Sequence, residues 1–446
     1  MKHLYIILFI LPLIGFGQGW VQVFGNLDKE QSSMFWKTYV KQTFDGGYIV
    51  LGTEVEDEYL DKVDVILIKT DENGEEEWTQ VFGVTNFDDY GHCIQTTEDG
   101  GYIITGQGEK LWLLKLDESG NINWSIQYGE EGDRGYSIQQ TNDGGYIVLG
   151  RKNSISQELW IIKIDENGNE EWENMLNIET YNMWYGGGRV IEQNDDGYVI
   201  SGSLSGGSPY QYFMYLIQIN NNGEIIWSQN YGGGLNENNN WGVEYWGGYM
   251  DQTSDGGYVL TGTIGNFLTG VTSCSSEDIF VVKTNSDGIL DWSKTLYSGP
   301  EGGNDIQQTT DGGYIIVSYS DIIEEEYIDY NLPPVSCSTE INILIIKLSS
   351  DGDVEFRKQI NGISDEQGDY STKGFSIEEI SDGGFIISGR VENGSTGTQG
   401  PILLIKTNGE GDVISTIELP NPTSKRELIK TTNILGQENT TIKNQP

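Results

Sequence analysis

One short motif recurs seven times along the chain and restricts the fold more than any other feature. It reads Asp-Gly-Gly-Tyr-Ile or a close variant, and a second run follows each copy and ends at a tryptophan in five of them. Successive copies lie between 44 and 71 residues apart. They begin at Asp45, Asp99, Asp143, Asp195, Asp255, Asp311 and Asp382. Such a period predicts copies of one structural unit, not two or three unrelated domains.

Each unit reads as four short strands. In the third copy we expect strands at 137–141, 146–149 and 159–164 and a fourth strand from Glu171, with a turn at 142–145. Asp-Gly-Gly and Asp-Glu-Asn-Gly are typical hairpin turns, because Asp and Asn bond their own backbone and Gly accepts a positive φ. The second and third strands are apolar almost throughout, which favours a sheet covered on both faces. The sequence therefore predicts an all-β, seven-bladed β-propeller of four-stranded antiparallel blades.

The start of the chain contains a strand without a blade of its own. Residues 17–25 nearly duplicate 74–83, which belong to the last strand of the first unit. We expect this N-terminal strand to pair into the last blade and close the ring, which removes exposed sheet edges. Residues 413–418 are a second candidate for the same place, and the sequence leaves the choice open. An open solenoid is the alternative architecture, but it would not need this split repeat.

Charge and the N-terminus restrict the partners and the compartment. The 25 basic and 68 acidic residues give a net charge of −43, so nucleic acid and anionic membranes are poor partners. Residues 1–17 have the basic start, apolar run and small-residue end of a signal peptide, and no other segment is apolar enough to span a membrane. We expect a secreted or cell-surface monomer with a propeller at 18–419 and a polar tail at 420–446.

Histidine and cysteine usage argues against several kinds of site. After residues 1–17, His92 is the only histidine, which excludes a zinc site built on several histidines. Asp71 and Asn73 resemble the first half of a calcium loop, but the later carboxylate is missing, which favours a turn. We expect no catalytic residues, metal or cofactor. The cysteine number is odd, and Cys274 and Cys337 occupy matching places in successive units, so they form either a disulfide or two free thiols.

The glycine that precedes each tryptophan by four residues resembles the tryptophan-docking motif of quinoprotein propellers. That resemblance implies that the tryptophan packs across the interface between blades, and no quinone site is implied here. The matching residues are Trp78, Trp124, Trp172, Trp227 and Trp292. The same turn also resembles the Asp-box of sialidase-like propellers, which is structural as well, so no sialidase activity follows from it.

Aromatic residues gather in the connections that vary between units, where rigid scaffolds usually carry function. We take as ligand-binding candidates Tyr181, Trp184, Tyr185, Tyr210, Tyr212, Trp241, Tyr245 and Trp246. Such platforms suit stacking on sugar rings or gripping a protein loop. The hypothesis is a binding or adhesion propeller for a polysaccharide or a surface protein. The alternative is a carbohydrate-active hydrolase or lyase that uses carboxylates or tyrosine on the same face.

The polar tail resembles the start of the C-terminal sorting domain of type IX secretion in Bacteroidetes. Residues 420–423 (Pro-Asn-Pro-Thr), 428–430 and 434–437 (Ile-Leu-Gly-Gln) carry the resemblance, which covers only this tail. It implies passage across the outer membrane, then release or attachment at the cell surface. The family's domain is longer, so we expect a truncated tail.

Overall fold

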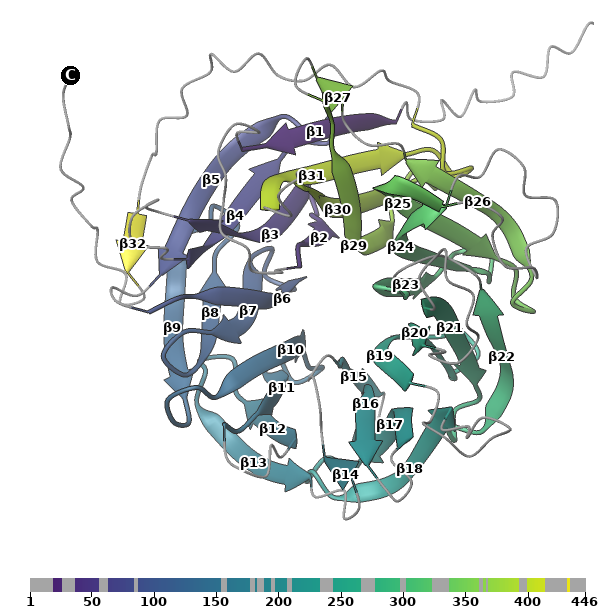
Figure 1. The fold of residues 1–446 in the computed structure, drawn as a ribbon. Helices are drawn as coiled ribbons and strands as arrows, with labels where there is room; N and C mark the ends of the chain where they lie inside the picture. The colour runs from purple at the N-terminus through teal and green to yellow at the C-terminus, as the bar shows by residue number, and fades with distance from the viewer. Residues whose placement is uncertain are drawn as a thin grey trace, which may run out of the picture.

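Seven antiparallel sheets stand side by side around one axis (Figure 1). In the described residues each sheet has four principal strands and no helix occurs, so the predicted seven-bladed propeller is confirmed. The computed structural model describes residues 19–25, 37–55, 63–83, 87–153, 159–176, 181–182, 188–193, 197–206, 211–232, 244–265, 277–296, 302–322, 337–360, 364–365, 368–392, 399–413 and 431–433.

The two inner strands of each blade are joined by the Asp-Gly-Gly turn. The innermost strands are β2 (Tyr39–Gln42), β6 (Tyr90–Thr96), β10 (Arg134–Gln140), β15 (Val190–Gln193), β19 (Glu244–Gln252), β23 (Asp305–Gln308) and β29 (Ser371–Glu379). The second strands are β3 (Tyr48–Val55), β7 (Tyr102–Gln107), β11 (Tyr146–Arg151), β16 (Gly197–Gly206), β20 (Tyr258–Gly265), β24 (Tyr314–Ile322) and β30 (Phe385–Glu392).

The two outer strands of each blade meet at the second turn of the repeat. The third strands are β4 (Val63–Thr70), β8 (Leu111–Leu116), β12 (Leu159–Ile164), β17 (Gln211–Ile219), β21 (Glu277–Thr284), β25 (Cys337–Leu348) and β31 (Gln399–Thr407). The outermost strands are β5 (Glu76–Gly83), β9 (Ile122–Tyr128), β13 (Glu170–Leu176), β18 (Ile225–Gly232), β22 (Leu290–Leu296), β26 (Val354–Ile360) and β1 (Trp20–Phe24). Both kinds of turn lie at one end of the ring, which we call the turn end, and the opposite end is the loop end.

Three short additions extend this pattern. β14 (Tyr181–Asn182) pairs with β16, and β27 (Ser364–Asp365) pairs with β28 (Gly368–Asp369). β32 (Thr431–Asn433), from the C-terminal tail, pairs in parallel with the outer edge of β5.

The third blade follows the predicted strands closely. β12 has the predicted bounds, and β13 starts one residue earlier than expected. β10 starts at Arg134, three residues before the predicted start, because its register shifts between Gly135 and Ser137 and pairing continues beyond that irregularity. Such bulges cannot be read from an alternating pattern.

The N-terminal strand closes the ring. β1 pairs antiparallel with β31, with Trp20 opposite Lys406 and Phe24 opposite Ile402. Figure 1 shows this purple strand lying along the yellow-green strand of the last blade. The chain therefore supplies the outermost strand of its last blade from its beginning, as predicted, and the solenoid is excluded.

The hydrophobic core is divided among the interfaces between blades. The buried side chains form seven clusters, and each cluster joins two neighbouring blades. The cluster between the last and first blades includes Phe24 of β1 with Val40 and Leu404. Burying one such side chain contributes about 1.5–3 kcal/mol. Each flat face of a blade is therefore covered by its neighbour.

A repeated ion pair stabilises the turn end. The lysine of the third strand is almost fully buried in five blades and slightly more exposed in the last, and its ammonium group contacts the turn aspartate. In the third blade, Lys163 contacts Asp143 at 2.9 Å and Glu171 at 3.1 Å. The equivalent contacts join Lys69 to Asp45, Lys115 to Asp99, Lys283 to Asp255, Lys347 to Asp311 and Lys406 to Asp382. Asp143 also accepts hydrogen bonds from Thr141 Oγ1 (2.6 Å) and the N–H of Gly145 (2.9 Å).

The predicted packing of tryptophan across the blade interface is confirmed. Trp78 meets Tyr102 of the next blade edge-on, with ring centroids 6.2 Å apart. It also covers the glycine of the next outer turn, since a Cβ at Gly120 would lie 3.0 Å from the Trp78 ring. The same glycine contact occurs between Trp124 and Gly168, Trp172 and Gly223, Trp227 and Gly288, Trp292 and Gly352, Phe356 and Gly411, and Trp20 and Gly74.

Candidate functional site

One level of the ring near the loop end differs from blade to blade. In every blade, the innermost residue six positions before the turn aspartate lies opposite the same position of the second strand. These seven residues therefore lie at the same height along the axis of the ring. They are Tyr39, Cys93, Ser137, Arg189, Tyr249, Asp305 and Ser376. Where the ring requires a contact, every blade tends to repeat the same residue. The residues at this level therefore differ from the repeated contacts that the seven blades share.

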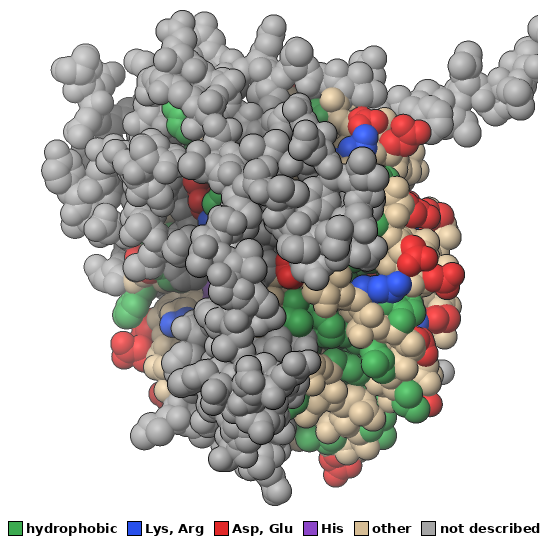
Figure 2. Space-filling view, turned by 45° about the vertical axis from the view of Figure 1, so that its right-hand side comes forward, with side chains coloured by type: hydrophobic (Ala, Val, Ile, Leu, Met, Phe, Trp, Pro, Cys, Tyr) green, Lys and Arg blue, Asp and Glu red, His purple; other side chains and the backbone are tan. Residues whose placement is uncertain are grey.

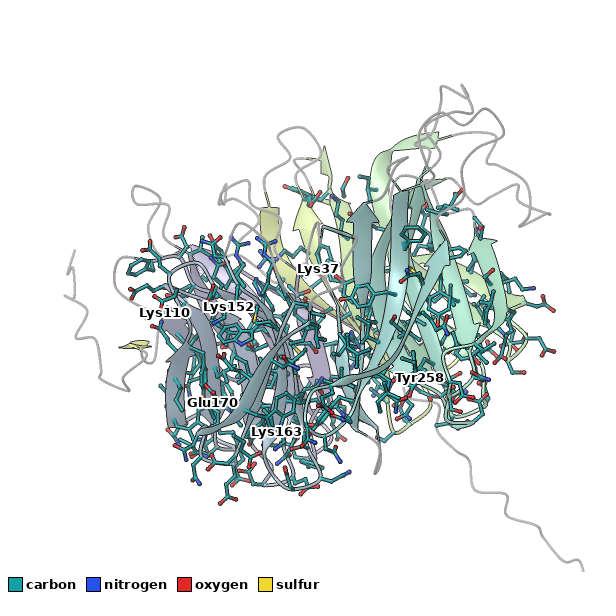
Figure 3. The ribbon with its side chains drawn as sticks, turned by 90° about the horizontal axis from the view of Figure 1, so that it is seen from below. Lys37, Lys110, Lys152, Lys163, Glu170 and Tyr258 are labelled. Atoms are coloured by element: carbon teal, nitrogen blue, oxygen red, sulfur yellow. The ribbon has the colours of Figure 1, made fainter. Side chains whose placement is uncertain are left out.

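Lys37 of the first blade reaches across the axis to the fifth and sixth blades. Its ammonium group donates to Tyr249 Oη (2.5 Å) and Asn304 Oδ1 (3.1 Å). It also lies 4.2 Å from the centre of the Tyr249 ring. Asn304 in turn donates to the carbonyl oxygen of Gly374 in the seventh blade (2.9 Å). In Figure 3, Lys37, Lys110 and Lys152 lie toward the loop end, whereas Lys163 and Tyr258 lie toward the turn end.

Arg189 makes the second contact between blades that are not neighbours. Its guanidinium group, from the fourth blade, donates to Asp305 of the sixth blade and lies 5.8 Å from the Tyr249 ring centre. Asp305 is 2% exposed and also accepts the N–H groups of Ile306 (3.0 Å) and Ile377 (3.1 Å). Lys37, Arg189, Tyr249, Asn304 and Asp305 are called the axial cluster below. Two cations thus share one phenol ring, and only one of them has a carboxylate partner among the described residues.

Burial disfavours the charged forms of two groups near the axial cluster, the Asp251 carboxyl and the Tyr39 phenol. Burial raises the pKa of Asp251. A hydrogen bond from the Gln308 N–H and the nearby cations Arg189 and Lys41 lower it, but burial is the larger effect. Burial, followed by the neighbouring Tyr249, also holds the pKa of Tyr39 well above its usual value. Both shifts disfavour negative charge at these two groups.

Sequence reasoning missed Lys37, although a signal for it exists. Eight residues before the turn aspartate, six units have glycine and the first has Lys37. The glycine is needed because the chain packs there on the preceding blade, and a Cβ at Gly91 would lie 2.6 Å from Leu51. Arg189 was missed for the same reason, because a repeat motif is defined by the residues that its copies share, and Arg189 stands where the copies differ.

His92 lies beside this level on β6. Its ring stacks on Tyr136 of the third blade, with centroids 5.6 Å apart, and Nδ1 lies 2.8 Å from the carbonyl oxygen of Gly135. Because a carbonyl only accepts, this contact requires a proton on Nδ1. Burial lowers the pKa of His92 to about 4, so the ring is neutral at pH 7. His92 and Tyr136 are both half-buried, so they present an aromatic surface that solvent reaches.

Half of the aromatic candidates chosen from sequence lie outside the described residues. Trp184, Tyr185, Tyr210 and Trp241 lie outside them. The backbone of four others is described: Tyr181 is in β14, Tyr212 in β17, and Tyr245 and Trp246 in β19. Their positions in these strands do not test the predicted binding role.

The proposed disulfide is also untested, because Cys274 lies outside the described residues and only the backbone of Cys337 is described. Cys93 is a free, half-buried thiol. Asp71 accepts the N–H groups of Asn73 and Glu75, both at 2.9 Å, as expected of a turn residue. Within the described residues, no group of three or more His, Cys, Asp or Glu is arranged to hold a metal ion, and no helix is suited to cross a membrane.

Comparisons with known proteins concern the fold alone. No protein-family model matches the sequence, and no curated protein matches it. A protein of unknown function from Dyadobacter fermentans is similar in structure at 10% identity and a TM-score of 0.44, covering 88% of this chain and 98% of its own. The Dos1 propeller is similar at 7% identity and a TM-score of 0.46, covering 83% and 95%. A protein of unknown function from Bacteroides caccae is similar at 10% identity and a TM-score of 0.39, covering 71% and 94%.

Proposed function

We propose that this protein is a secreted or cell-surface propeller that binds a polysaccharide or a surface protein at its loop end. The observation that carries the proposal is the axial cluster. Its polar side chains come from non-neighbouring blades and are not repeated, so the geometry of the ring does not account for them. The turn end, in contrast, has repeated ion pairs that the fold itself explains.

The connections at the loop end support the same assignment. Those between second and third strands range from 108–110 in the second blade to 323–336 in the sixth. Connections of variable length on a rigid scaffold are the usual place for recognition. The eight aromatic candidates belong to this end by their place in the repeat.

A binding role fits the charged groups of the axis better than hydrolysis does. Glycoside hydrolysis commonly uses two carboxyl groups, one as a general acid and one as a nucleophile or base. Near the axis, burial raises the pKa of one carboxyl group, that of Asp251. Asp305, on the neighbouring strand, is occupied by Arg189 and two backbone N–H groups, so it is poorly placed to attack a substrate.

A screen of the chain from Gln18 against glycans and cell-surface proteins tests this proposal. Once a ligand is found, replacing Trp184, Trp241 and Trp246 together with alanine should weaken binding at least tenfold. Phe44 is a matched control, because it is an aromatic residue at the turn end with 75% of its surface exposed. Phe44→Ala should leave binding unchanged. Equal binding by the triple variant, or release of new reducing ends from a bound glycan, would contradict the proposal.

A further inference from the structure

Lys37 is one of two described lysines for which the structure shows no acidic partner, and it is the one on the axis. The chain has 68 acidic and 25 basic residues, so a lysine is easily paired. Apart from Lys37 and Lys110, every described lysine has a carboxylate oxygen within 4.0 Å. The acceptors that Lys37 does have, Tyr249 Oη and Asn304 Oδ1, are uncharged. Its position is also the one where the other six units have glycine.

The geometry of Lys37 leaves capacity for a charged ligand. An ammonium group has three N–H donors, and the described residues accept from two of them. The two acceptors hold the group at a defined place on the axis, where solvent still reaches the half-buried side chain. A hydrogen bond to a carboxylate is about twice as strong as one between neutral groups. A third bond to an incoming carboxylate would therefore add a negative charge that the described residues do not supply.

The surroundings favour a sugar acid over a simple anion. On the face that Figure 2 shows, the described surface carries many acidic and few basic side chains. The net charge of −43 makes the protein as a whole repel anions. Charges beyond about 8 Å are largely screened at physiological salt, so recognition depends on contacts close to Lys37. Tyr39, Tyr249 and the stacked pair of His92 and Tyr136 are half-buried aromatic groups around the axis. Flat rings of this kind suit the apolar face of a pyranose ring.

We propose that the axial cluster binds the carboxylate of a uronic acid residue in an acidic polysaccharide, with Lys37 as the direct contact. This inference rests on the proposed binding function and specifies its ligand class. Arg189 is held by Asp305 and by the Tyr249 ring, so it positions the phenol that carries Lys37. The aromatic groups contact the sugar ring, and Lys37 distinguishes a uronic acid from the corresponding neutral sugar.

Calorimetric titration of the chain from Gln18 with defined oligosaccharides tests this inference. The panel contains oligomers of galacturonate, mannuronate, guluronate and glucuronate, the fully methyl-esterified galacturonate oligomer, a neutral galactose oligomer and poly-glutamate. At least one uronate oligomer should bind, and its uncharged counterpart should bind at least tenfold more weakly. Lys37→Met should weaken uronate binding by about ten- to hundredfold, as expected for loss of one hydrogen bond between charged groups. Lys37→Arg should retain part of the affinity.

Lys110→Met is the matched control, because Lys110 also lacks a described acidic partner and lies toward the loop end, but on the second blade (Figure 3). It should bind like the unmodified chain. Unchanged thermal midpoints would show that the variants are folded.

Three results would overturn the inference: no uronate oligomer binds, the methyl ester binds equally well, or Lys37→Met has no effect. Tighter binding of poly-glutamate would identify an acidic peptide as the ligand instead. If a neutral glycan or a protein binds while all uronates fail, this inference falls and the proposed function stands.

Discussion

Trp20 lies edge-on to Tyr48, with ring centroids 5.8 Å apart, and this contact joins the last blade to the first. Trp20 belongs to β1, which completes the last blade, whereas Tyr48 begins the second strand of the first blade. A Cβ at Gly74 would lie 2.5 Å from the Trp20 ring, so Trp20 also covers the outer turn of the first blade. Trp20 therefore occupies, at the point of closure, the place of the tryptophans at the other interfaces.

Trp20→Ala should lower the free energy of unfolding by about 2–3 kcal/mol, somewhat less than for a fully buried tryptophan because Trp20 is half-buried. Urea unfolding followed by circular dichroism measures the loss. Trp20→Phe is the control, since it keeps an aromatic ring in the slot, and it should lose clearly less. Equal stability of Trp20→Ala and the unmodified chain would show that closure does not depend on this ring.

Substitutions at two glycines of the fifth blade distinguish the cost of backbone strain from the cost of displaced packing. Gly256 and Gly288 both have a positive φ, 83° and 69°. A Cβ at Gly256 would meet only Ser286 at 3.9 Å, whereas a Cβ at Gly288 would lie 2.6 Å from the Trp227 ring. Gly256→Ala should therefore cost about 1–2 kcal/mol of strain. Gly288→Ala should cost a further 1–3 kcal/mol for the displaced ring. Equal losses by the two variants in thermal unfolding would show that the tryptophan tolerates the added methyl group.

Because the aspartates of the repeated turns have lowered pKa values, we expect the protein to lose stability in acid. Partial burial alone would raise the pKa of Asp143, but hydrogen bonds from Thr141 and Lys163 outweigh it and lower the pKa to about 2. Asp255 and Asp311 also have pKa values of about 2. Because these values lie below the ordinary 3.8, the stabilisation is complete above about pH 4 and is lost as the pH falls toward 2.

Asp143→Asn should therefore lose stability at pH 7 and show a flatter dependence on pH between 4 and 2. The effect of one site is modest, because 58% of the Asp143 side chain is exposed. Urea unfolding at a series of pH values provides the comparison. A variant profile parallel to that of the unmodified chain over this window would rule out the predicted coupling.

From His92 we expect a second dependence of stability on pH, at higher pH than that of the aspartates. Its pKa of about 4 in the folded chain lies below the ordinary value of 6.5, so the unfolded chain binds the proton first as the pH falls. Stability should thus decrease from about pH 6.5 toward pH 4, and His92→Gln should remove this part of the decrease. In the chain from Gln18, His92 is the only histidine, so NMR titration of its ring measures the pKa directly. A measured pKa near 6.5 would contradict the prediction.

The repeat predicted the ring well because the same physical requirement occurs seven times. The turn role of Asp143 could be assigned from sequence, because Thr141 and Gly145, which bond to it, belong to the same motif. The packing of Trp78 followed from the resemblance to the tryptophan-docking motif, because the glycine that it covers recurs in the next unit. The contact of Lys37 with Tyr249 could not be predicted in this way, because it joins the first blade to the fifth across the axis. The distance between the Lys37 ammonium group and the Tyr249 hydroxyl depends on the diameter of the ring and on the bulges in the inner strands. Neither is encoded in a local sequence pattern. Arg189 and Asp305, which are 116 positions apart, were missed for the same reason.

The pairing of β1 with β31 has a consequence for the order of events during synthesis. Trp20 cannot pair until Lys406 has been synthesised, 386 residues later. At typical elongation rates of 5–20 residues per second this delay is about 20–80 s. During that time the first strand has no partner in its own chain, and the first blade lacks a cover on one face. A nascent chain is therefore exposed to premature pairing with other strands, and complete protection of the first blade against hydrogen exchange must come after the last blade has formed.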